Sequence, residues 1–302
     1  MGNNPSILLL SKNAGLTSFA SLYPVKRHVD PKVGHAGTLD KFAEGLMIAL
    51  TGAMTRLNPL FSGMDKEYVA TILFGEETDT LDPEGKVVAV AEIPALETIQ
   101  TRIVSTFIGD LTQTPPQYSA VHIGGRRAYS LARNGMEVEM PERPIRIHSF
   151  EVVSWESPRL VARIAVSKGT YIRSIARDLG KACGSCARLE RLVRTKIGPY
   201  ELDEAVDPDD TEALKASVSL TAELLDRLPG CGRIVVADAA LFPLGNGCIP
   251  RASDILDAET SIEDRYACLC SQDGTLRAVA ALSGRDRIER IVAQIEPQRT
   301  RL

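Results

Sequence analysis

The 302-residue chain has few of the residues that usually carry metal or redox chemistry: only four histidines, one tryptophan and six cysteines. Cys183 and Cys186 have C-x-x-C spacing, but no second pair and no nearby histidine completes a zinc site, which favours free thiols in a reducing compartment. Motifs for P-loop phosphate binding, dinucleotide binding, zinc-dependent hydrolysis and serine hydrolysis are also absent from the sequence. These absences disfavour nucleotide hydrolysis, dinucleotide redox and metal-centred hydrolysis, and leave carboxylate chemistry.

Long hydrophobic runs are missing too. The apolar run near the start, SILLL, is too short to span a membrane, and neither a basic region nor a small-residue cleavage site accompanies it. We therefore expect no membrane segment, no secretory signal and a cytoplasmic location. The composition is that of a globular protein, and the chain is long enough to bury a core without disulfides.

Charge is unevenly distributed, although the net charge is only −4. Residues 121–200 hold 15 Lys/Arg and 7 Asp/Glu, a balance of +8, whereas residues 201–302 hold 11 and 19, a balance of −8. A basic middle is what contacts with nucleic-acid phosphates need. Residues that are close in sequence need not share a surface, so a solvated mixed surface is the alternative.

The hydrophobic periodicity predicts a chain that contains both strands and helices. After Tyr200 an acidic connector follows. From about Cys231 short β-like runs recur, which predicts a small β-rich domain that is all-β. We divide the chain into domains at 1–226 and 227–302. The predicted strands and helices are strands 6–10, 45–50, 68–74, 145–155 and 160–167, the last two paired, and helices 16–26, 53–61, 95–107, 127–135 and 172–179, the last ending at Gly180, with a loop at 115–125.

Asp40 is the best candidate for a reactive carboxylate. It follows the glycine-punctuated stretch GHAGTLD and precedes an apolar strand that would anchor it. A carboxylate can attack an electron-poor carbon and form a covalent intermediate. By itself the pattern favours a plainer role, because Asp residues often cap turns in glycine-rich loops.

A second group lies in the stretch SKGTYIR, at a strand-to-helix junction. Arg173 could pair with a carboxylate and hold it ionised, or form a surface ion pair. Tyr171 could stack on a nucleobase, or pack as a core aromatic. Tyr68, at the start of a strand, fits a stacking or proton-accepting role as well as simple packing.

His35, between glycines, could wedge into RNA or make a loop hydrogen bond. Lys12 and Lys66 fit phosphate contacts or solvated lysines equally well.

Several motifs in one continuous order make the stretch from Ser6 to about Tyr200 resemble the TruB family of tRNA pseudouridine synthases. They are SILLLSKNAGLTS, GHAGTLDKFAEGL, DKEYVATILFGEETDTLDPEG, PPQYSAVHIGGRRAYSLARNG, RPIRIHSFEV, SKGTYIRSIARDLG and RLERLVRTKIGPY. The resemblance implies the pseudouridine synthase fold, an α+β fold with a mixed, mainly antiparallel sheet and flanking helices. It also makes the region after Cys231 loosely similar to a PUA-type RNA-binding module.

The resemblance also implies roles for individual residues. Asp40 matches the catalytic nucleophile, Arg173 the arginine that pairs with it, and Tyr68 the tyrosine that stacks on the target base and helps remove its proton. Four further residues match substrate-binding positions of the family: Lys12, His35, Tyr171 and Leu192.

The implied reaction converts uridine 55 in the T loop of tRNA to pseudouridine without a cofactor or metal, after the base is flipped out of the loop. The expected partner is the T-stem-loop of tRNA, and the expected oligomeric state is a monomer. Attack by Asp40 on the sugar, attack on the base ring, and assistance of elimination at the sugar all remain open.

The chain departs from the family pattern at Asn13 and Lys41, where proline is usual, at Glu44, where a small hydroxyl residue is usual, and at His122, where lysine is usual. Two other functions are compatible with parts of the sequence. A non-catalytic RNA-binding protein would not need Asp40. A carboxylate-dependent glycosidase would need a second carboxylate as general acid, for which Glu44 is the nearest candidate.

Overall fold

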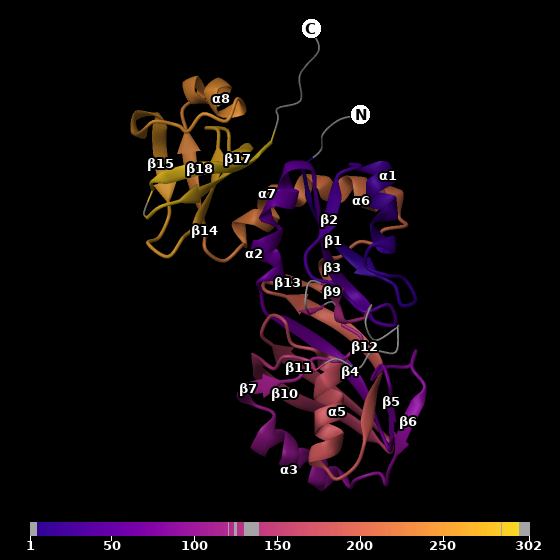
Figure 1. The fold of residues 1–302 in the computed structure, drawn as a ribbon. Helices are drawn as coiled ribbons and strands as arrows, with labels where there is room; N and C mark the ends of the chain where they lie inside the picture. Colours follow the sequence, from indigo (N-terminus) through magenta and orange to yellow (C-terminus); the bar gives the residue numbers. More distant parts are fainter. Residues whose placement is uncertain (1–4, 120, 124–125, 130–138, 285, 296–302) are drawn as a thin grey trace.

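Two larger β-sheets organise the chain (Figure 1). The computed structural model describes residues 5–119, 121–123, 126–129, 139–284 and 286–295. Within them, no helix is long and apolar enough to cross a membrane.

The larger sheet has nine strands in the order β1-β3-β12-β4-β11-β10-β7, with β2 beside β3 and β13 beside β12. Only β3 and β12 run parallel among its described pairs, so the mixed, mainly antiparallel sheet is confirmed. Its strands are β1 (Ile7–Lys12), β2 (Val33–His35), β3 (Glu44–Thr51), β4 (Lys66–Phe74), β7 (Gly109–Gln113), β10 (Arg143–Glu156), β11 (Arg159–Val166), β12 (Ala187–Ile197) and β13 (Tyr200–Glu201).

The alternation of apolar residues sets which face of each strand is buried. In β4, Tyr68, Ala70 and Ile72 point to the buried face, because side chains two residues apart share a face of a sheet. The pairing predicted for 145–155 and 160–167 is confirmed, with Phe150 opposite Ile164 in the antiparallel register of β10 and β11.

Helices pack against strands of the larger sheet. Helix α5 lies against β12 and β4 (Figure 1) and buries Ile172, Ile175 and Leu179, which are spaced as one face of a helix requires. The helices are α1 (Tyr23–His28), α2 (Asn58–Ser62), α3 (Leu96–Thr106), α5 (Ile172–Ala182), α6 (Thr211–Ser217), α7 (Thr221–Asp226) and α8 (Asp238–Gly245), with 3-10 turns η1 (Ala20–Leu22), η2 (Gly52–Leu57), η3 (Leu202–Glu204), η4 (Val218–Leu220) and η5 (Ala252–Asp254).

Helix α5 does not end at Gly180, as predicted, but continues to Ala182. Gly180 is needed for close packing, since a Cβ there would lie 2.6 Å from the backbone nitrogen of Ala187. The helix is terminated by a Schellman motif at Gly184, two residues beyond Ala182. Gly184 has a φ of +68° and its N–H bonds to Lys181 O, and Ser185 N bonds to Gly180 O. The C-x-x-C pair thus brackets a helix end, and both thiols are free.

Two other predictions need correction. The helix expected at 16–26 begins later, with η1 and then α1, because the Thr17 hydroxyl accepts from Ala20 N (3.1 Å) and the Ser18 hydroxyl bonds to Leu39 instead. The loop expected at 115–125 contains β8 (His122–Ile123), which pairs with β9 (Arg126–Arg127). The helix expected at 127–135 lies largely outside the described residues.

The second sheet has the order β15-β14-β16-β17-β18 and confirms a β-rich C-terminal region. It is not all-β as predicted, since α8 follows its first strand. One buried apolar cluster joins residues of both sheets, including Ile7 of β1, Leu225 of α7 and Val279 of β17. The remaining strands are β5 (Glu76–Thr78) and β6 (Val87–Val90), which form a hairpin, and β14 (Cys231–Val236), β15 (Ile255–Glu259), β16 (Tyr266–Cys270), β17 (Leu276–Leu282) and β18 (Ile288–Gln294).

Candidate active site

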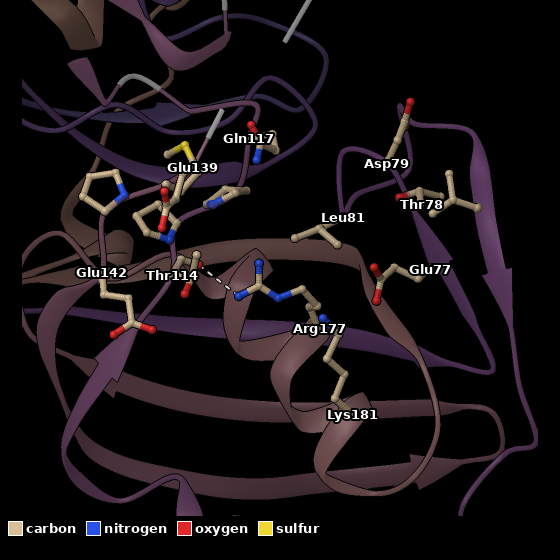
Figure 2. A pocket seen from close by; sticks show the side chains of 15 residues that line it. Glu77, Thr78, Asp79, Leu81, Thr114, Gln117, Glu139, Glu142, Arg177 and Lys181 are labelled. Atoms are coloured by element: carbon tan, nitrogen blue, oxygen red, sulfur yellow. Dashed lines mark hydrogen bonds between the residues drawn. The ribbon is translucent and has the colours of Figure 1, made fainter. Parts of the chain in front are cut away.

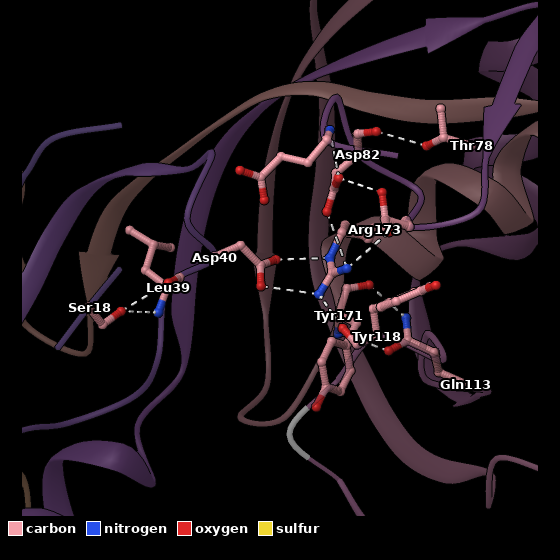
Figure 3. A network of polar contacts seen from close by, with 11 residues as sticks. Ser18, Leu39, Asp40, Thr78, Asp82, Gln113, Tyr118, Tyr171 and Arg173 are labelled. Atoms are coloured by element: carbon pink, nitrogen blue, oxygen red, sulfur yellow. Dashed lines mark hydrogen bonds and ion pairs between the residues drawn. The ribbon is translucent and has the colours of Figure 1, made fainter. Parts of the chain in front are cut away.

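Asp40 lies in the loop between β2 and β3, and its two neighbours are anchored by the segment that follows β1. Gly15 N donates to Lys41 O at 2.8 Å. On the other side, Ser18 Oγ accepts from Leu39 N at 2.8 Å and lies 2.9 Å from Leu39 O (Figure 3). The backbone on each side of the carboxylate is therefore held in place.

Arg173, in the first turn of α5, lies beside the Asp40 carboxylate and contacts both of its oxygens (Figure 3). Its Nη2 donates to Asp40 Oδ1 at 3.1 Å, and its Nε lies 2.9 Å from Oδ2 without the alignment of a hydrogen bond. Bonds from the guanidinium to Thr80 O (2.9 Å) and Tyr118 O (3.0 Å) fix its plane. Only 5% of the Arg173 side chain is exposed, against 35% for Asp40, so the carboxylate is accessible while its partner is buried.

A second carboxylate, Asp82, shares the same guanidinium. Arg173 Nη1 lies 3.3 Å from Asp82 Oδ2, and Asp82 Oδ1 accepts from Thr80 Oγ1 (2.6 Å) and Glu84 N (3.0 Å). Burial raises the pKa of Asp82, opposed by the hydrogen bond from Thr80 and the charge of Arg173. The neighbouring Leu81 has a φ of +63°, a left-handed conformation that is uncommon for a side chain of this kind.

Sequence analysis missed Asp82, because the stretch TDTLDPEG has the composition of an ordinary turn. It named Glu44 instead as the nearest second carboxylate, and the structure corrects this. Glu44 forms an ion pair with Arg191, and Asp82 is the carboxylate that Arg173 links to Asp40.

Tyr68 and Leu192 contribute an apolar wall. In the antiparallel register of β4 and β12, Leu192 lies opposite Ala70, two residues from Tyr68 on the same face. Tyr68 is 8% and Leu192 is 4% exposed, and both belong to the buried cluster that contains Leu39, the residue before Asp40. The two strands thus place both predicted pocket residues in the apolar cluster beside the Asp40 loop.

Tyr171 is the residue before α5, and its backbone is held by Gln113 at the end of β7. Tyr171 N donates to Gln113 Oε1 (2.8 Å), and Gln113 Nε2 donates to Tyr171 O (3.1 Å). The guanidinium carbon of Arg143 lies 5.5 Å from the ring centroid, within the range of a cation–π contact. These contacts fix the ring at the junction that also positions Arg173 (Figure 3).

Lys12 is almost completely buried and holds the backbone just after Asp40. Its Nζ donates to Ala43 O (2.5 Å) and Asn13 O (3.0 Å), and Lys41 O lies at 3.4 Å. Burial, together with the nearby charge of Arg194, lowers the pKa of Lys12 to about 8. In this structure Lys12 therefore acts as a clamp on the Asp40 loop.

Arg194, which sequence analysis did not single out, is 1% exposed and holds the same loop from β12. Its Nε donates to Leu46 O (2.7 Å) and its Nη2 to Gly37 O (3.3 Å). Gly45 permits this approach, since its φ is +109° and a Cβ there would lie 2.4 Å from Arg194 O. No feature of RLERLVRTK distinguishes this arginine from its neighbours, so only the structure reveals it.

His35 ends β2 at the entrance to the loop. Its Nδ1 is buried without a hydrogen-bond partner. Burial and the charge of Arg194 lower the pKa of His35, so the imidazole is neutral at neutral pH. A neutral ring with an unused nitrogen can still accept or donate a hydrogen bond to an incoming ligand.

A cleft of about 960 Å³ is lined in part by Thr78, Asp79 and Leu81, which come just before Asp82 in the chain (Figure 2). Leu81 and Gln117 line it, while the adjoining Thr80 and Tyr118 supply the carbonyl groups that bind Arg173. Arg177 borders the cleft from α5, and its Nη2 donates to Thr114 O at 2.9 Å. The loops that fix Arg173 therefore also form a wall of this cleft.

Comparison with known proteins shows which family the chain belongs to. Residues 25–172 match the family model described as the N-terminal domain of TruB family pseudouridylate synthases. The tRNA pseudouridine synthase B of Borreliella burgdorferi (strain ZS7) is 46% identical over 202 residues, covering 66% of this chain and 71% of the relative. The tRNA pseudouridine synthase B of Bordetella avium is 42% identical, covering 69% and 87%. The chain belongs to the TruB family.

The TruB family consists of pseudouridine synthases, so this chain is an isomerase that modifies RNA. Solved structures agree on the fold. A chain of a Cbf5-Nop10-Gar1 complex has a TM-score of 0.67 at 20% identity, covering 96% of this chain and 85% of that one. A chain of an H/ACA RNP bound to a substrate RNA containing 2'-deoxyuridine has the same TM-score and identity, with coverages of 97% and 86%.

Proposed function

We propose that this TruB-family chain converts uridine 55 in the T loop of tRNA to pseudouridine, with Asp40 as the nucleophile. The observation that supports this most strongly is the accessible Asp40 carboxylate, held by the buried Arg173. Such a pair orients a charged nucleophile before substrate binds, which lowers the cost of reaching the transition state.

In the proposed reaction the target base first leaves the stack of the T loop, at a cost of a few kcal/mol. Stacking on Tyr68 offsets part of this, since a base–aromatic contact contributes about 1–3 kcal/mol. The Asp40 carboxylate then attacks and forms a transient covalent bond to the sugar or to the base ring, and the glycosidic bond from C1′ to N1 breaks. After the base turns, a bond from C1′ to C5 forms and the bond to Asp40 breaks, which returns Asp40 to a free carboxylate. N1 gains a proton and C5 loses one.

The partner we propose is the T-stem-loop of tRNA; the names of the relatives state that those proteins act on tRNA. We propose a cytoplasmic monomer with residues 1–226 as catalytic domain and residues 227–302 as a PUA-like module. No cofactor or metal takes part in the proposed reaction. The residues proposed to contact substrate, beside the catalytic Asp40, Tyr68 and Arg173, are Lys12, His35, Tyr171 and Leu192.

The test is to incubate the protein with a T-stem-loop RNA and map pseudouridine at each uridine. Asp40→Asn keeps the shape of the side chain but cannot act as nucleophile, so product should vanish while RNA binding stays nearly intact. The matched control is Asp110→Asn, which alters an exposed carboxylate that also pairs with an arginine, Arg146, but lies on the edge strand β7. Product formation by Asp40→Asn at a tenth of the normal rate or more would contradict the proposal, and release of free uracil would indicate a glycosidase.

A further inference from the structure

An exposed aromatic pair lies next to the Asp40 loop, outside the site described above. Phe19 is 75% exposed and Tyr23 is 65% exposed, unusually high values for aromatic side chains in an otherwise well-packed segment. Leu16, just before them, is also exposed. The polypeptide that presents them runs from the end of β1 through η1 to α1.

The aromatic pair is followed by two basic residues in α1. Phe19 has helical backbone angles and leads through the 3-10 turn η1 into α1, which begins at Tyr23, and both rings are exposed to solvent. Lys26 and Arg27 follow in the next turn and are exposed as well. We call Phe19, Tyr23, Lys26 and Arg27 the aromatic–basic stripe.

The opposite side of this segment is firmly packed, so the exposure of the stripe is not a sign of loose structure. Leu22 and Val25 are buried in a cluster with Leu8 and Leu10 of β1 and Met47 of β3. The helix is therefore amphipathic in an unusual way, with apolar residues on the buried side and aromatic residues on the solvent side.

The segment is bonded directly to the neighbours of the nucleophile. Ser18, beside Phe19, makes the two contacts with Leu39, and Gly15 donates to Lys41. The segment that carries the stripe is therefore bonded to the loop that carries Asp40.

Charge indicates which kind of molecule the stripe fits. Residues 13–28 contain no Asp or Glu, and no carboxylate in the described part of the chain lies within ion-pair distance of Lys26 or Arg27. Flat aromatic rings beside uncompensated positive charge are the chemistry that binds unpaired nucleotides, through base stacking and phosphate contacts.

We propose that the aromatic–basic stripe is a docking surface for RNA. Unpaired bases of the substrate stack on Phe19 and Tyr23, and Lys26 and Arg27 contact the backbone phosphates that follow. This inference rests on the proposed function, because it takes the substrate to be a folded RNA with unpaired bases near the target uridine.

The test compares RNA binding and single-turnover rate for the double variant Phe19→Ala/Tyr23→Ala. Affinity for the T-stem-loop RNA should fall at least about tenfold, since each stacked base contributes about 1–3 kcal/mol and the double variant removes two stacking rings. The single-turnover rate at saturating RNA should stay within about twofold, because neither side chain reaches the reacting atoms. Phe242→Ala, which removes an aromatic residue that is 83% exposed on α8, is the matched control and should leave both quantities unchanged.

A second variant, Lys26→Gln/Arg27→Gln, should reduce the slope of log affinity against log salt by about 1.4–1.8, for two phosphate contacts. Unchanged affinity in the aromatic double variant, or self-association that the variant abolishes, would overturn the proposal. If the wild type binds RNA through the stripe but forms no pseudouridine, the proposed function fails while the docking surface stands.

Discussion

Replacing Arg173 by methionine should produce two separable effects, because the one guanidinium serves two carboxylates with different surroundings. Asp40 is partly exposed, whereas the side chain of Asp82 is only 7% exposed. Loss of the ion pair with Asp40 should lower the rate of the reaction, and loss of the ion pair with Asp82 should lower the free energy of unfolding.

The size of the stability effect follows from the burial of Asp82. Removing one partner of a buried ion pair typically costs about 3–5 kcal/mol, because the remaining charge is left uncompensated. Solvent can replace the lost partner at Asp40, so we assign little of this cost to Asp40. The free energy of unfolding at pH 7 should therefore fall by about 3–5 kcal/mol in Arg173→Met.

The pH dependence should identify Asp82 as the source. A carboxyl whose folded-state pKa is raised destabilises the fold when it is ionised. This penalty is complete above the raised pKa and disappears as the pH falls below about 3.9, the value for the unfolded chain. The gap in stability between Arg173→Met and the wild type should accordingly narrow as the pH is lowered.

Urea unfolding and single-turnover pseudouridine formation measure the two effects. Arg173→Met/Asp82→Asn should regain most of the lost stability, because no buried charge remains, yet its rate should stay about a hundredfold or more below normal, because Asp40 has lost its orienting partner. The reasoning is refuted if the double variant is no more stable than Arg173→Met, or if Arg173→Met converts bound RNA at the normal rate.

Three further predictions concern packing, titration and charge. Gly180→Ala should lower the free energy of unfolding by about 1–3 kcal/mol through overcrowding against Ala187, and an unaffected urea midpoint would contradict this. Because the pKa of Lys12 is lowered to about 8, its buried charge destabilises the fold below about pH 8 and the penalty disappears as the pH rises toward 10.5. Urea titrations should thus show that Lys12→Met flattens the rise of stability over that interval, and an identical profile would show that Lys12 is not the source. Arg287→Gln/Arg290→Gln should leave the salt dependence of RNA binding nearly unchanged, and a large loss of slope would place the main phosphate contacts in the acidic C-terminal region.

Much of the architecture could be predicted from local patterns. The alternation in β4 and in the β10–β11 hairpin indicated both the strands and their buried faces, and the spacing of Ile172, Ile175 and Leu179 indicated α5. The pairing of Arg173 with a carboxylate was one of two readings of the sequence, and the family resemblance selected Asp40 as its partner. The ion pair between them is present in the structure.

The charge pattern shows what such local information omits. The balance of +8 over residues 121–200 predicted a basic surface, yet at least seven of its fifteen basic residues pair with carboxylates, most of them from elsewhere in the fold. These residues are Arg146, Arg159, Arg173, Arg177, Arg188, Arg191 and Lys196. Counting charges along the chain cannot detect this neutralisation, because the partner of a side chain depends on which strands become neighbours.

The sequence by itself indicated the principal strands and helices and, through its resemblance to the TruB family, singled out Asp40 as the candidate nucleophile, because periodicity and short motifs are properties of neighbouring residues. Only the tertiary structure decided that Asp82 shares Arg173 with Asp40 and that Arg194 holds Gly37, contacts that join residues 91 and 157 positions apart. It also decided that Phe19 and Tyr23 remain exposed beside the Asp40 loop. Burial and pairing over such separations follow from how the sheet and its loops pack, and no local pattern encodes them.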